Sequence, residues 1–318
     1  MRSLRPHIVV TLSLAALLIA CGPSPQPSQS EQSEAAPMAK PMPKKEPGVV
    51  KFAARDFSFQ GPSEVPSGWV TIHFQNNGEQ THFMFLTQLP EGKTLDDYRD
   101  DVAVPFGKAW EELKSGADKA QVGQDLGAAL PEWYLTSAPH MGGPGLLAPG
   151  GSETVTLKLD PGNYVVECYV RSPEGEFHGD LGMLRKLTVT AADSGRSEPT
   201  GDVDLNLTND AIELEGALTA GTHTVAVHFV EHPPVGLGND VHLARLAADT
   251  DMDELAQWMD WMNVDGMQAP APVEFHGGVQ EMPAGNTAYV EVSLVPGRYA
   301  WISEPVRNEG HVKEFVVE

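Results

Sequence analysis

Long apolar runs are almost absent from this sequence. Only residues 8–20 form one, and they follow Arg2 and Arg5 at the start of the chain. The run is too short and has the wrong flanks for a membrane-spanning helix, whereas both features are typical of a secretory signal. No other stretch is apolar enough to span a bilayer. The sequence therefore predicts an exported protein with residues 1–20 as its signal peptide.

Cysteine is equally scarce, since only Cys21 and Cys168 occur in 318 residues. The signal ends in the letters LIAC, which resemble the lipobox of bacterial lipoproteins. The resemblance implies cleavage before Cys21 and attachment of lipid to its sulfur. Gly22 is not the aspartate that favours inner-membrane retention, so we expect an outer-membrane anchor that faces the periplasm. The alternative is an ordinary signal peptide that is cut nearby.

If Cys21 carries lipid, the chain cannot form an internal disulfide. Cys168 is then a lone thiol in an oxidising compartment, which is unusual. Such a thiol is either buried and inert, or it has a metal or redox role.

Basic residues are also few, because 21 Lys and Arg stand against 44 Asp and Glu, giving a formal net charge of −23. Such a surface repels nucleic acid and attracts cationic partners, although solubility alone explains it. The sequence also lacks a P-loop, a dinucleotide-binding fingerprint and a nucleophile elbow. These absences argue against a nucleic-acid partner and against the enzymes that such motifs mark.

Residues 21–48 are rich in Pro, Ser and Gln and have almost no bulky apolar residues, so we expect a disordered tether. From residue 49, short alternating apolar runs separated by Pro and Gly predict an all-β fold of sandwich type. Residues 106–130 have helical periodicity instead, with breaks expected near Gly116 and Gly123. A later helical stretch places a stripe of expected core residues on one face, namely Met252, Leu255, Met259 and Met262.

The second half of the sequence repeats the first. The repeat is clearest in two similar segments, which are HMGGPGLLAPGGSETVTLKLDPGNYVVECYV, from residue 140, and HGGVQEMPAGNTAYVEVSLVPGRYAWISEP, from residue 276. Both segments run from His and Gly-Gly through Pro-x-Gly, an alternating strand and Pro-Gly-x-Tyr to a further strand. The repeat predicts two copies of one domain, over residues 49–192 and 202–318, with a linker at residues 193–201 and a helical insertion in each copy.

The first copy carries a set of soft ligands, since Cys168, His178 and Met183 offer a thiol, an imidazole and a thioether that suit copper. The strand pair that leads to Cys168, and the segment FQNNGEQTHFMFL before it, resemble those of the cupredoxins, the blue-copper proteins. The resemblance covers residues 50–190 and implies a Greek-key β-sandwich. It also implies that His82, Cys168 and His178 are the strong ligands of one copper ion and that Met183 is the axial ligand.

The loop between Cys168 and His178 departs from the family, because nine residues separate them where simple blue-copper proteins use a much shorter loop. The letters SPEG within it predict a turn. If Arg171 paired with Glu176 across this turn, Cys168 and His178 would point to opposite faces. A bulge or an irregular loop is then required to aim both side chains at one pocket.

The second copy keeps only part of this set. His242 stands where His82 stands, Ser303 falls at the position of Cys168, and nothing replaces Met183. A hydroxyl cannot supply the covalency of a thiolate, so we predict a degenerate module that packs or binds a partner. The alternative is a weaker metal site formed by His242, His276 and His311.

Two further observations concern the role of the site. His140 precedes a Gly-Gly pair, as His276 does, and is a candidate for an alternative ligand or for a residue that hydrogen-bonds a ligand. Two-domain copper nitrite reductases and multicopper oxidases bridge their copper centres with adjacent His and Cys, whereas Glu167 and Tyr169 flank Cys168. We therefore predict that the protein is not an enzyme.

The sequence thus predicts a lipid-anchored cell-envelope protein whose first domain binds one copper ion. Its function would be single-electron transfer or copper handling, with an unidentified redox or copper-handling protein as partner. The alternative is an interaction module of the cell envelope that has this fold but no metal.

Overall fold

The structure, a computed structural model, describes residues 48–233 and 238–318. The predicted signal peptide, Cys21 and all but the last residue of the predicted tether lie outside these residues. The described residues belong to one compact unit, Lys45–Glu318. Among their helices, none has the length and apolar composition needed to cross a membrane.

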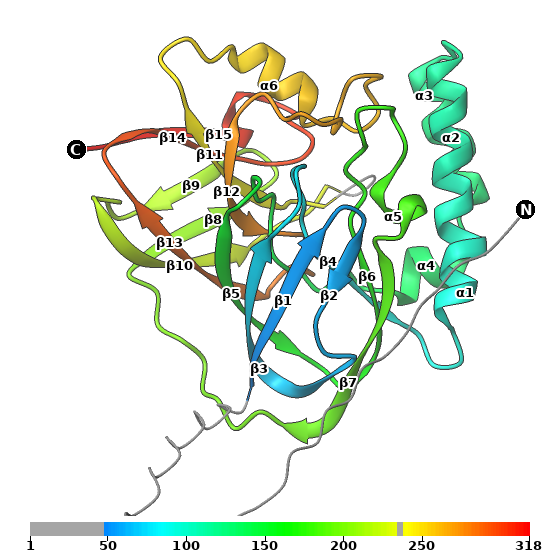
Figure 1. The fold of residues 1–318 in the computed structure, drawn as a ribbon, viewed down its shortest axis with the longest axis horizontal. Coiled ribbons are helices and arrows are strands. Elements are labelled where there is room, and N and C mark those ends of the chain that lie inside the picture. The colour runs from blue at the N-terminus through cyan, green and yellow to red at the C-terminus, as the bar shows by residue number, and fades with distance from the viewer. Residues whose placement is uncertain (1–47, 234–237) are drawn as a thin grey trace, which may run out of the picture. The chain divides into compact units, whose positions relative to one another are not determined.

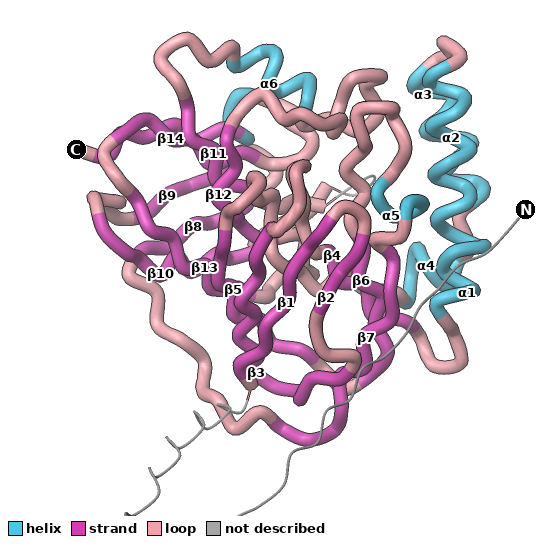
Figure 2. Tube along the Cα trace, viewed as in Figure 1, coloured by secondary structure: helices cyan, strands magenta, loops and turns pink. Residues whose placement is uncertain are grey.

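Strands make up most of the regular structure, and helices are inserted between them (Figure 2). The strands up to residue 193 are β1 (Val49–Arg55), β2 (Ser58–Gln60), β3 (Glu64–Asn76), β4 (Phe85–Leu89), β5 (Ser152–Leu159), β6 (Gly162–Glu167) and β7 (Leu184–Asp193). The later strands are β8 (Val203–Leu207), β9 (Ile212–Glu215), β10 (Gly221–Phe229), β11 (Val241–Leu246), β12 (Glu274–Val279), β13 (Thr287–Leu294), β14 (Gly297–Ile302) and β15 (Val312–Val317). The predicted all-β sandwich class is confirmed.

Strand β3 takes part in both layers of the first half. Its residues 68–75 pair antiparallel with β5, while residues 64–67 pair parallel with β7. Gly68 lies where the pairing changes and has a φ of +84°, a conformation that residues with a Cβ atom rarely adopt. The first layer is completed by β1, which pairs parallel with β3 and antiparallel with β2, and the second by the antiparallel strands β4, β6 and β7.

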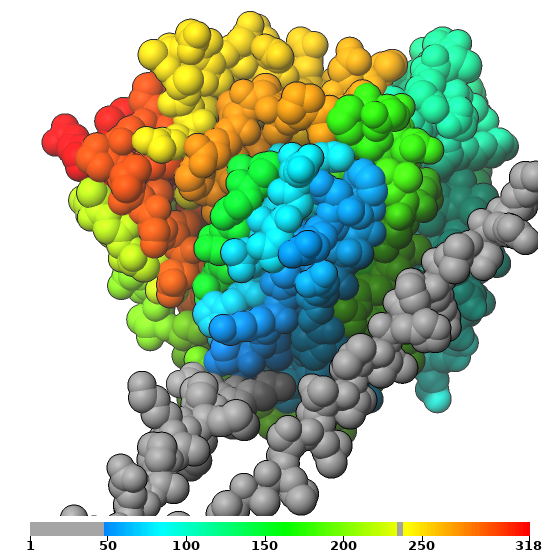
Figure 3. Space-filling view, in the orientation of Figure 1, coloured from blue at the N-terminus to red at the C-terminus, as the bar shows by residue number. Residues whose placement is uncertain are grey.

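The strands of residues 203–317 pair in a similar way, except that β10 and β15 do not pair with each other as β3 and β7 do. Strand β8 pairs antiparallel with β9 and parallel with β10, β10 pairs antiparallel with β13, and β11, β14 and β15 are antiparallel neighbours. Strand β12 is added at the other edge of β11. Residues 154–156 of β5 pair with residues 289–291 of β13, so one sheet continues from the first half into the second (Figure 1). In the face drawn in Figure 3, segments of the two halves lie directly against each other.

All helices of the first half except α5 (His178–Leu181), which lies between β6 and β7, are inserted between β4 and β5. They are α1 (Leu95–Tyr98), the π-helix η1 (Arg99–Ala103), α2 (Val104–Lys114), α3 (Lys119–Ala129) and α4 (Glu132–Ser137). Figure 1 shows them on one flank, beside β6, and the Tyr98 hydroxyl donates to Glu167 at the end of β6. In the second half, α6 (Met252–Trp258) follows β11, and its Trp258 stacks on Phe275 of β12. An η2 turn (Glu309–His311) precedes β15.

The helix predictions are partly confirmed. Helix α2 ends just before Gly116, as expected, whereas Gly123 lies inside α3 and does not interrupt it. A glycine in a helix costs only about 1 kcal/mol relative to alanine, and the Asp118 side chain caps α3 by accepting the Gln121 N–H. The expected core stripe near α6 is confirmed, since its side chains are buried or pack against the core: Met252, Leu255, Met259 and Met262.

Candidate metal centre

Three ligand-type side chains from distant points of the first half meet in its interior. His82 lies between β3 and β4, Cys168 directly follows β6, and His178 begins α5 (His178–Leu181). The Cys168 Sγ lies 3.6 Å from the His178 Nδ1 and 3.9 Å from the His82 Nδ1, and the two Nδ1 atoms are 3.1 Å apart. All three side chains are fully buried. The structure thus brings together the three residues expected to be strong ligands.

The register of the loop between Cys168 and His178 makes this convergence possible. Arg171 pairs with Phe177, so the pairing with Glu176 that was considered from the sequence does not occur. Because side chains alternate along a strand, a shift by one residue exchanges the two faces. His178 therefore lies on the same side as Cys168. The irregular loop that the sequence required is formed by residues 172–176.

The far nitrogen of each imidazole is held by a hydrogen bond. The His82 Nε2 lies 2.5 Å from the Asp56 Oδ1, and the His178 Nε2 lies 2.9 Å from the Gln80 Oε1. A carboxylate and an amide oxygen only accept hydrogen bonds, so both Nε2 atoms carry the hydrogen. Both Nδ1 lone pairs therefore face inward, toward each other and toward the sulfur.

The atoms that face the inside of this cluster have more electron pairs than hydrogens to form hydrogen bonds with them. Two imidazole lone pairs face each other across 3.1 Å, and the Cys168 thiol, whose Sγ lies 3.6 Å from the His178 Nδ1, is the one group of the three that can offer a hydrogen to either of them. A soft metal ion would accept all three electron pairs at once. The donor set of this site therefore fits the copper ion that the cupredoxin resemblance implies.

Burial keeps these three groups uncharged. It raises the pKa of the Cys168 thiol to about 12. It also lowers the pKa of His178 to about 3, an effect that neighbouring His82 reinforces. The pKa of His82 is lowered by burial as well, although Asp56 opposes the shift. At neutral pH both imidazoles keep their Nδ1 lone pairs, and the thiol keeps its proton until a metal displaces it.

Met183, the expected axial ligand, is a backbone neighbour of two of these residues. The Cys168 N–H donates to the Met183 carbonyl at 3.1 Å, and the Met183 N–H donates to the His178 carbonyl at 2.8 Å. The Met183 side chain is fully buried. The Phe57 ring packs 4.9 Å from the His178 ring and adds an apolar wall. That Met183 acts as a ligand remains a prediction.

His140 is engaged elsewhere. Its Nδ1 lies 3.2 Å from the Glu281 Oε2, and its Nε2 lies 3.3 Å from the Tyr134 hydroxyl. The ring also packs edge-on against Phe85, with the ring centroids 4.6 Å apart. Both ring nitrogens of His140 are thus occupied by partners outside the cluster of His82, Cys168 and His178.

A second buried cluster lies in the second half, where ligand atoms of Asp240, His242 and Glu304 are all within 4.8 Å of one another. The His242 Nδ1 accepts the Leu146 N–H at 3.1 Å, and its Nε2 lies 3.1 Å from the Asp240 Oδ2. A neutral imidazole has one lone pair, and Leu146 occupies it, so the Nε2 carries the hydrogen and donates to Asp240. His242 therefore has no electron pair left for a metal, and this cluster is a hydrogen-bonded network.

The weaker site considered from the sequence is not assembled. The His311 Nε2 donates to the Asn209 carbonyl at 3.1 Å, and its Nδ1 accepts the Arg307 N–H at 3.2 Å. The His276 Nε2 is directed to Glu274, at 3.7 Å. Within the described ranges, neither residue joins His242 in a cluster of ligand atoms. His242 and His311 are each hydrogen-bonded to residues about 100 positions away in the sequence, and the three imidazoles do not converge.

Sequence reasoning missed the residues that orient these histidines. Gln80 precedes His82 by two positions, as Asp240 precedes His242, so this shared spacing was a signal that the sequence offered. Asp56 carries no such signal, because it reaches His82 only through the packing of the loop after β1. Ser303, at the cysteine position of the second half, donates to the Asp240 Oδ1 at 3.1 Å.

Replacing Asp56 with alanine is expected to lower copper affinity by about 10- to 100-fold, because the His82 ring loses the bond that fixes its tautomer and orientation. Competition with a copper chelator measures this. Glu79→Gln is the matched control, since it removes an exposed negative charge next to the site and leaves the bond to His82 in place. Equal affinities for Asp56→Ala and the control would contradict this role.

Comparison with known proteins gives similarity to solved structures only. No protein-family model and no curated protein matches the chain. Among solved structures, an auracyanin from Roseiflexus castenholzii is 23% identical over 45% of this chain and 97% of its own, with a TM-score of 0.25. The blue-copper protein auracyanin A from Chloroflexus aurantiacus is 19% identical over 45% and 98%, with a TM-score of 0.27. A multicopper oxidase is 14% identical over 85% and 88%, with a TM-score of 0.22.

Proposed function

We propose that this protein binds one copper ion through His82, Cys168 and His178, with Met183 as axial ligand, and uses it in the cell envelope for single-electron transfer or copper handling. The supporting observation is the inward convergence of two imidazole lone pairs and a sulfur, with both imidazole hydrogens on the far side. Bound copper would supply a one-electron couple. Asp56 and Gln80 would hold the two rings still during the change of charge.

Burial favours electron transfer over copper delivery. All three proposed strong ligands are 0% exposed, so a metal could leave only after the surrounding chain opened. An electron needs no such opening. Copper handling therefore predicts rapid metal exchange, whereas electron transfer predicts slow metal exchange and rapid oxidation and reduction.

We further propose a role without catalysis. Glu167 and Tyr169 flank Cys168, so neither neighbour can carry the electron to a second copper through an adjacent imidazole. In the second half, the one lone pair of His242 is already used by Leu146. Both observations support a single redox centre. The non-metal interaction module is the competing function, and copper titration separates the two.

The two-copy organisation, with domains at residues 49–192 and 202–318 joined by residues 193–201, also remains a proposal. The similar strand pairing of the two halves supports it, since the pairs β1–β3, β3–β5, β4–β6 and β6–β7 correspond to β8–β10, β10–β13, β11–β14 and β14–β15. The β3–β7 pairing of the first half has no such counterpart among the described strands. The sequence repeat supports it independently. On this proposal the second copy lost its thiol, and its former site became the Asp240–His242–Glu304 network.

Lipid attachment at Cys21 is proposed from the sequence alone. We expect Cys21→Ser to move the protein from the membrane fraction to the soluble periplasmic fraction, because no acyl chain can then be attached to it. Fractionation of cells that express each form measures this. If the variant stays with the membranes, lipid at Cys21 is not the anchor.

Copper binding is expected to release about one proton per ion between pH 6 and 8. The sign follows from the pKa values, since the thiol, at about 12, is still protonated in that range, whereas His178, at about 3, has already lost its proton. Calorimetry in buffers of different ionisation enthalpy counts the protons. Release of two or more would mean that an imidazole was charged before the metal arrived.

Titration of the metal-free protein with Cu(II) tests the proposed function. We expect one bound ion and an absorption band at about 600 nm, which is typical of copper bound to a thiolate and imidazoles. Stopped-flow reduction by a small electron donor, together with exchange of isotopically labelled copper, separates electron transfer from copper handling. Colourless protein with no bound copper would support the interaction module instead.

A further inference from the structure

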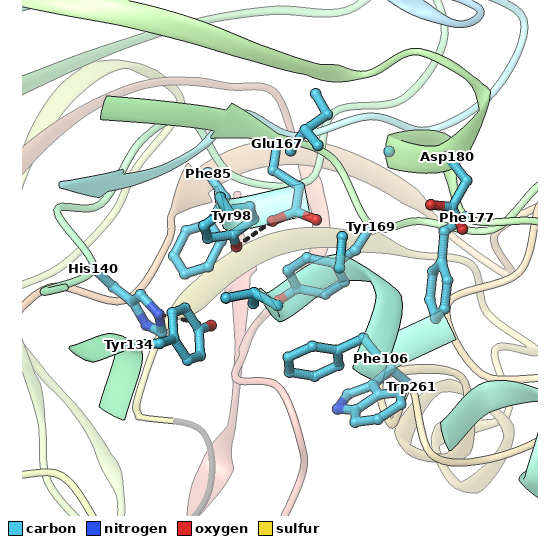
Figure 4. A pocket seen from close by; sticks show the side chains of 14 residues that line it. Phe85, Tyr98, Phe106, Tyr134, His140, Glu167, Tyr169, Phe177, Asp180 and Trp261 are labelled. Atoms are coloured by element: carbon cyan, nitrogen blue, oxygen red, sulfur yellow. Dashed lines mark hydrogen bonds between the residues drawn. The ribbon is translucent and has the colours of Figure 1, made fainter. Parts of the chain in front are cut away.

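A pocket lined mainly by aromatic rings lies beside the candidate metal centre (Figure 4). Its wall includes Glu167 and Tyr169, the two neighbours of Cys168 in the chain. The first-half helices supply Tyr98, Phe106 and other residues, and the second half supplies Trp261. The pocket has about 60 Å³ of open space, enough for roughly four water molecules. It therefore suits a group of a few heavy atoms.

The ionisable side chains of this wall include two carboxyl groups and one imidazole, His140, whose Nδ1 lies 3.2 Å from the Glu281 Oε2. Glu167 and Asp180 both line the pocket, and its lining contains no lysine or arginine. The Tyr98 hydroxyl donates to the Glu167 Oε2 at 2.7 Å, which leaves the Oε1 as an acceptor without a hydrogen bond among the described residues. The formal charge of the chain, −23, has the same sign as the two carboxylates. An anion is therefore disfavoured in this pocket and a cation is favoured.

The aromatic residues add a second attraction for the same kind of ligand. Phe106 and Trp261 pack with their ring centroids 5.4 Å apart, and Tyr98 and Tyr134 pack at 5.9 Å. Figure 4 shows these two pairs around the space below Glu167. The faces of aromatic rings attract cations, and cages of such rings bind methylated ammonium groups. A neutral apolar ligand would gain from the rings but would offer no hydrogen to the Glu167 Oε1.

We propose that this pocket binds an alkylammonium head group, which comes either from a small methylated amine or from a lysine side chain of a partner protein. The proposal does not depend on copper, because the pocket residues and the three proposed strong ligands are different side chains. With copper bound, the occupant would sit next to both neighbours of Cys168.

Binding to the metal-free protein tests the proposal, with Trp261 in the pocket wall as a fluorescent reporter. The probes are methylammonium, tetramethylammonium, a short peptide with one lysine, and choline beside its neutral carbon analogue, 3,3-dimethylbutanol. Measurements are made at pH 8.5, well above the ordinary pKa of carboxyl groups. The variants are Glu167→Gln and Asp180→Asn, and Glu174→Gln is the control because this exposed carboxylate does not line the pocket.

We expect saturable binding of at least one ammonium probe and at least about tenfold weaker binding of 3,3-dimethylbutanol than of choline. Glu167→Gln or Asp180→Asn should weaken ammonium binding about tenfold, while Glu174→Gln should not; thermal unfolding identifies any variant that fails to fold. Binding of the methylated ions alone assigns the pocket to free amines, and binding of the lysine peptide assigns it to a partner's side chain. No saturable binding, equal binding of choline and its neutral analogue, or no effect of either folded variant would overturn the proposal.

Discussion

Replacing Cys168 with serine is expected to remove the absorption at about 600 nm and to lower copper affinity by more than about 100-fold. The sulfur is the one soft, negatively charged donor that the cluster can offer, because His82 and His178 bind as neutral imidazoles. Titration with Cu(II), followed by absorption and by metal analysis, measures both effects. A serine variant that kept the band would show that the colour arises elsewhere.

The matched control is the reciprocal change in the second half, Ser303→Cys. This places a thiol at the position that corresponds to Cys168. The Nδ1 of His242 still accepts the Leu146 N–H, however, and its Nε2 still donates to Asp240. We therefore expect no second absorption band and no second tightly bound copper ion. Gain of a second coloured site would show that a thiol at position 303 is sufficient to bind copper, whatever the hydrogen bonds of the His242 imidazole.

Replacing Glu304 with glutamine is expected to stabilise the protein increasingly as the pH rises. The carboxyl is buried, its Oε2 accepts the Tyr169 hydroxyl at 3.1 Å, and its Oε1 has no partner among the described residues. Burial first, and then the charge of Asp240, raises the pKa of Glu304 well above its ordinary value. Such a group is most favourable to folding below its unfolded-state pKa, about 4.3, and above that it costs up to about 1.4 kcal/mol per pH unit.

Denaturant unfolding at pH 5 and pH 8 measures this effect. The difference in unfolding free energy between Glu304→Gln and the unmodified protein should be larger at pH 8. At that pH the glutamate is ionised in the unfolded chain, whereas burial opposes its ionisation in the folded protein, and glutamine does not titrate. Glu309→Gln, which removes an exposed carboxyl from the neighbouring turn, is the control and should show no such difference. A difference that is the same at both pH values would mean that Glu304 has an ordinary pKa.

The strands could be predicted from the local pattern of apolar residues, and the proposed strong ligands from their order along the chain. Alternating apolar residues predict strands wherever one face is buried, and the order of His82, Cys168 and His178 carries the resemblance to cupredoxins. The helix break at Gly116 followed for the same reason. At Gly123 the local preference was outweighed by the cap and the packing of α3.

The loop between the ligands and the groups behind them could not be predicted in this way. Pairing of Arg171 with Phe177 or with Glu176 differs by one residue, and the turn letters allow both. Asp56 is far from His82 in sequence and meets it only in the folded chain. The failure of His242 as a ligand depends on a backbone N–H of Leu146, which belongs to the other half. Each of these features is set by tertiary packing.

Copper-edge X-ray absorption of the protein loaded with one copper ion tests the central claim most directly. The proposed function predicts that copper is bound by the sulfur of Cys168 and by two imidazole nitrogens, from His82 and His178. Loss of the sulfur signal in Cys168→Ser should accompany it. A shell of nitrogen and oxygen alone in the unmodified protein would contradict the claim that these three side chains form a copper centre.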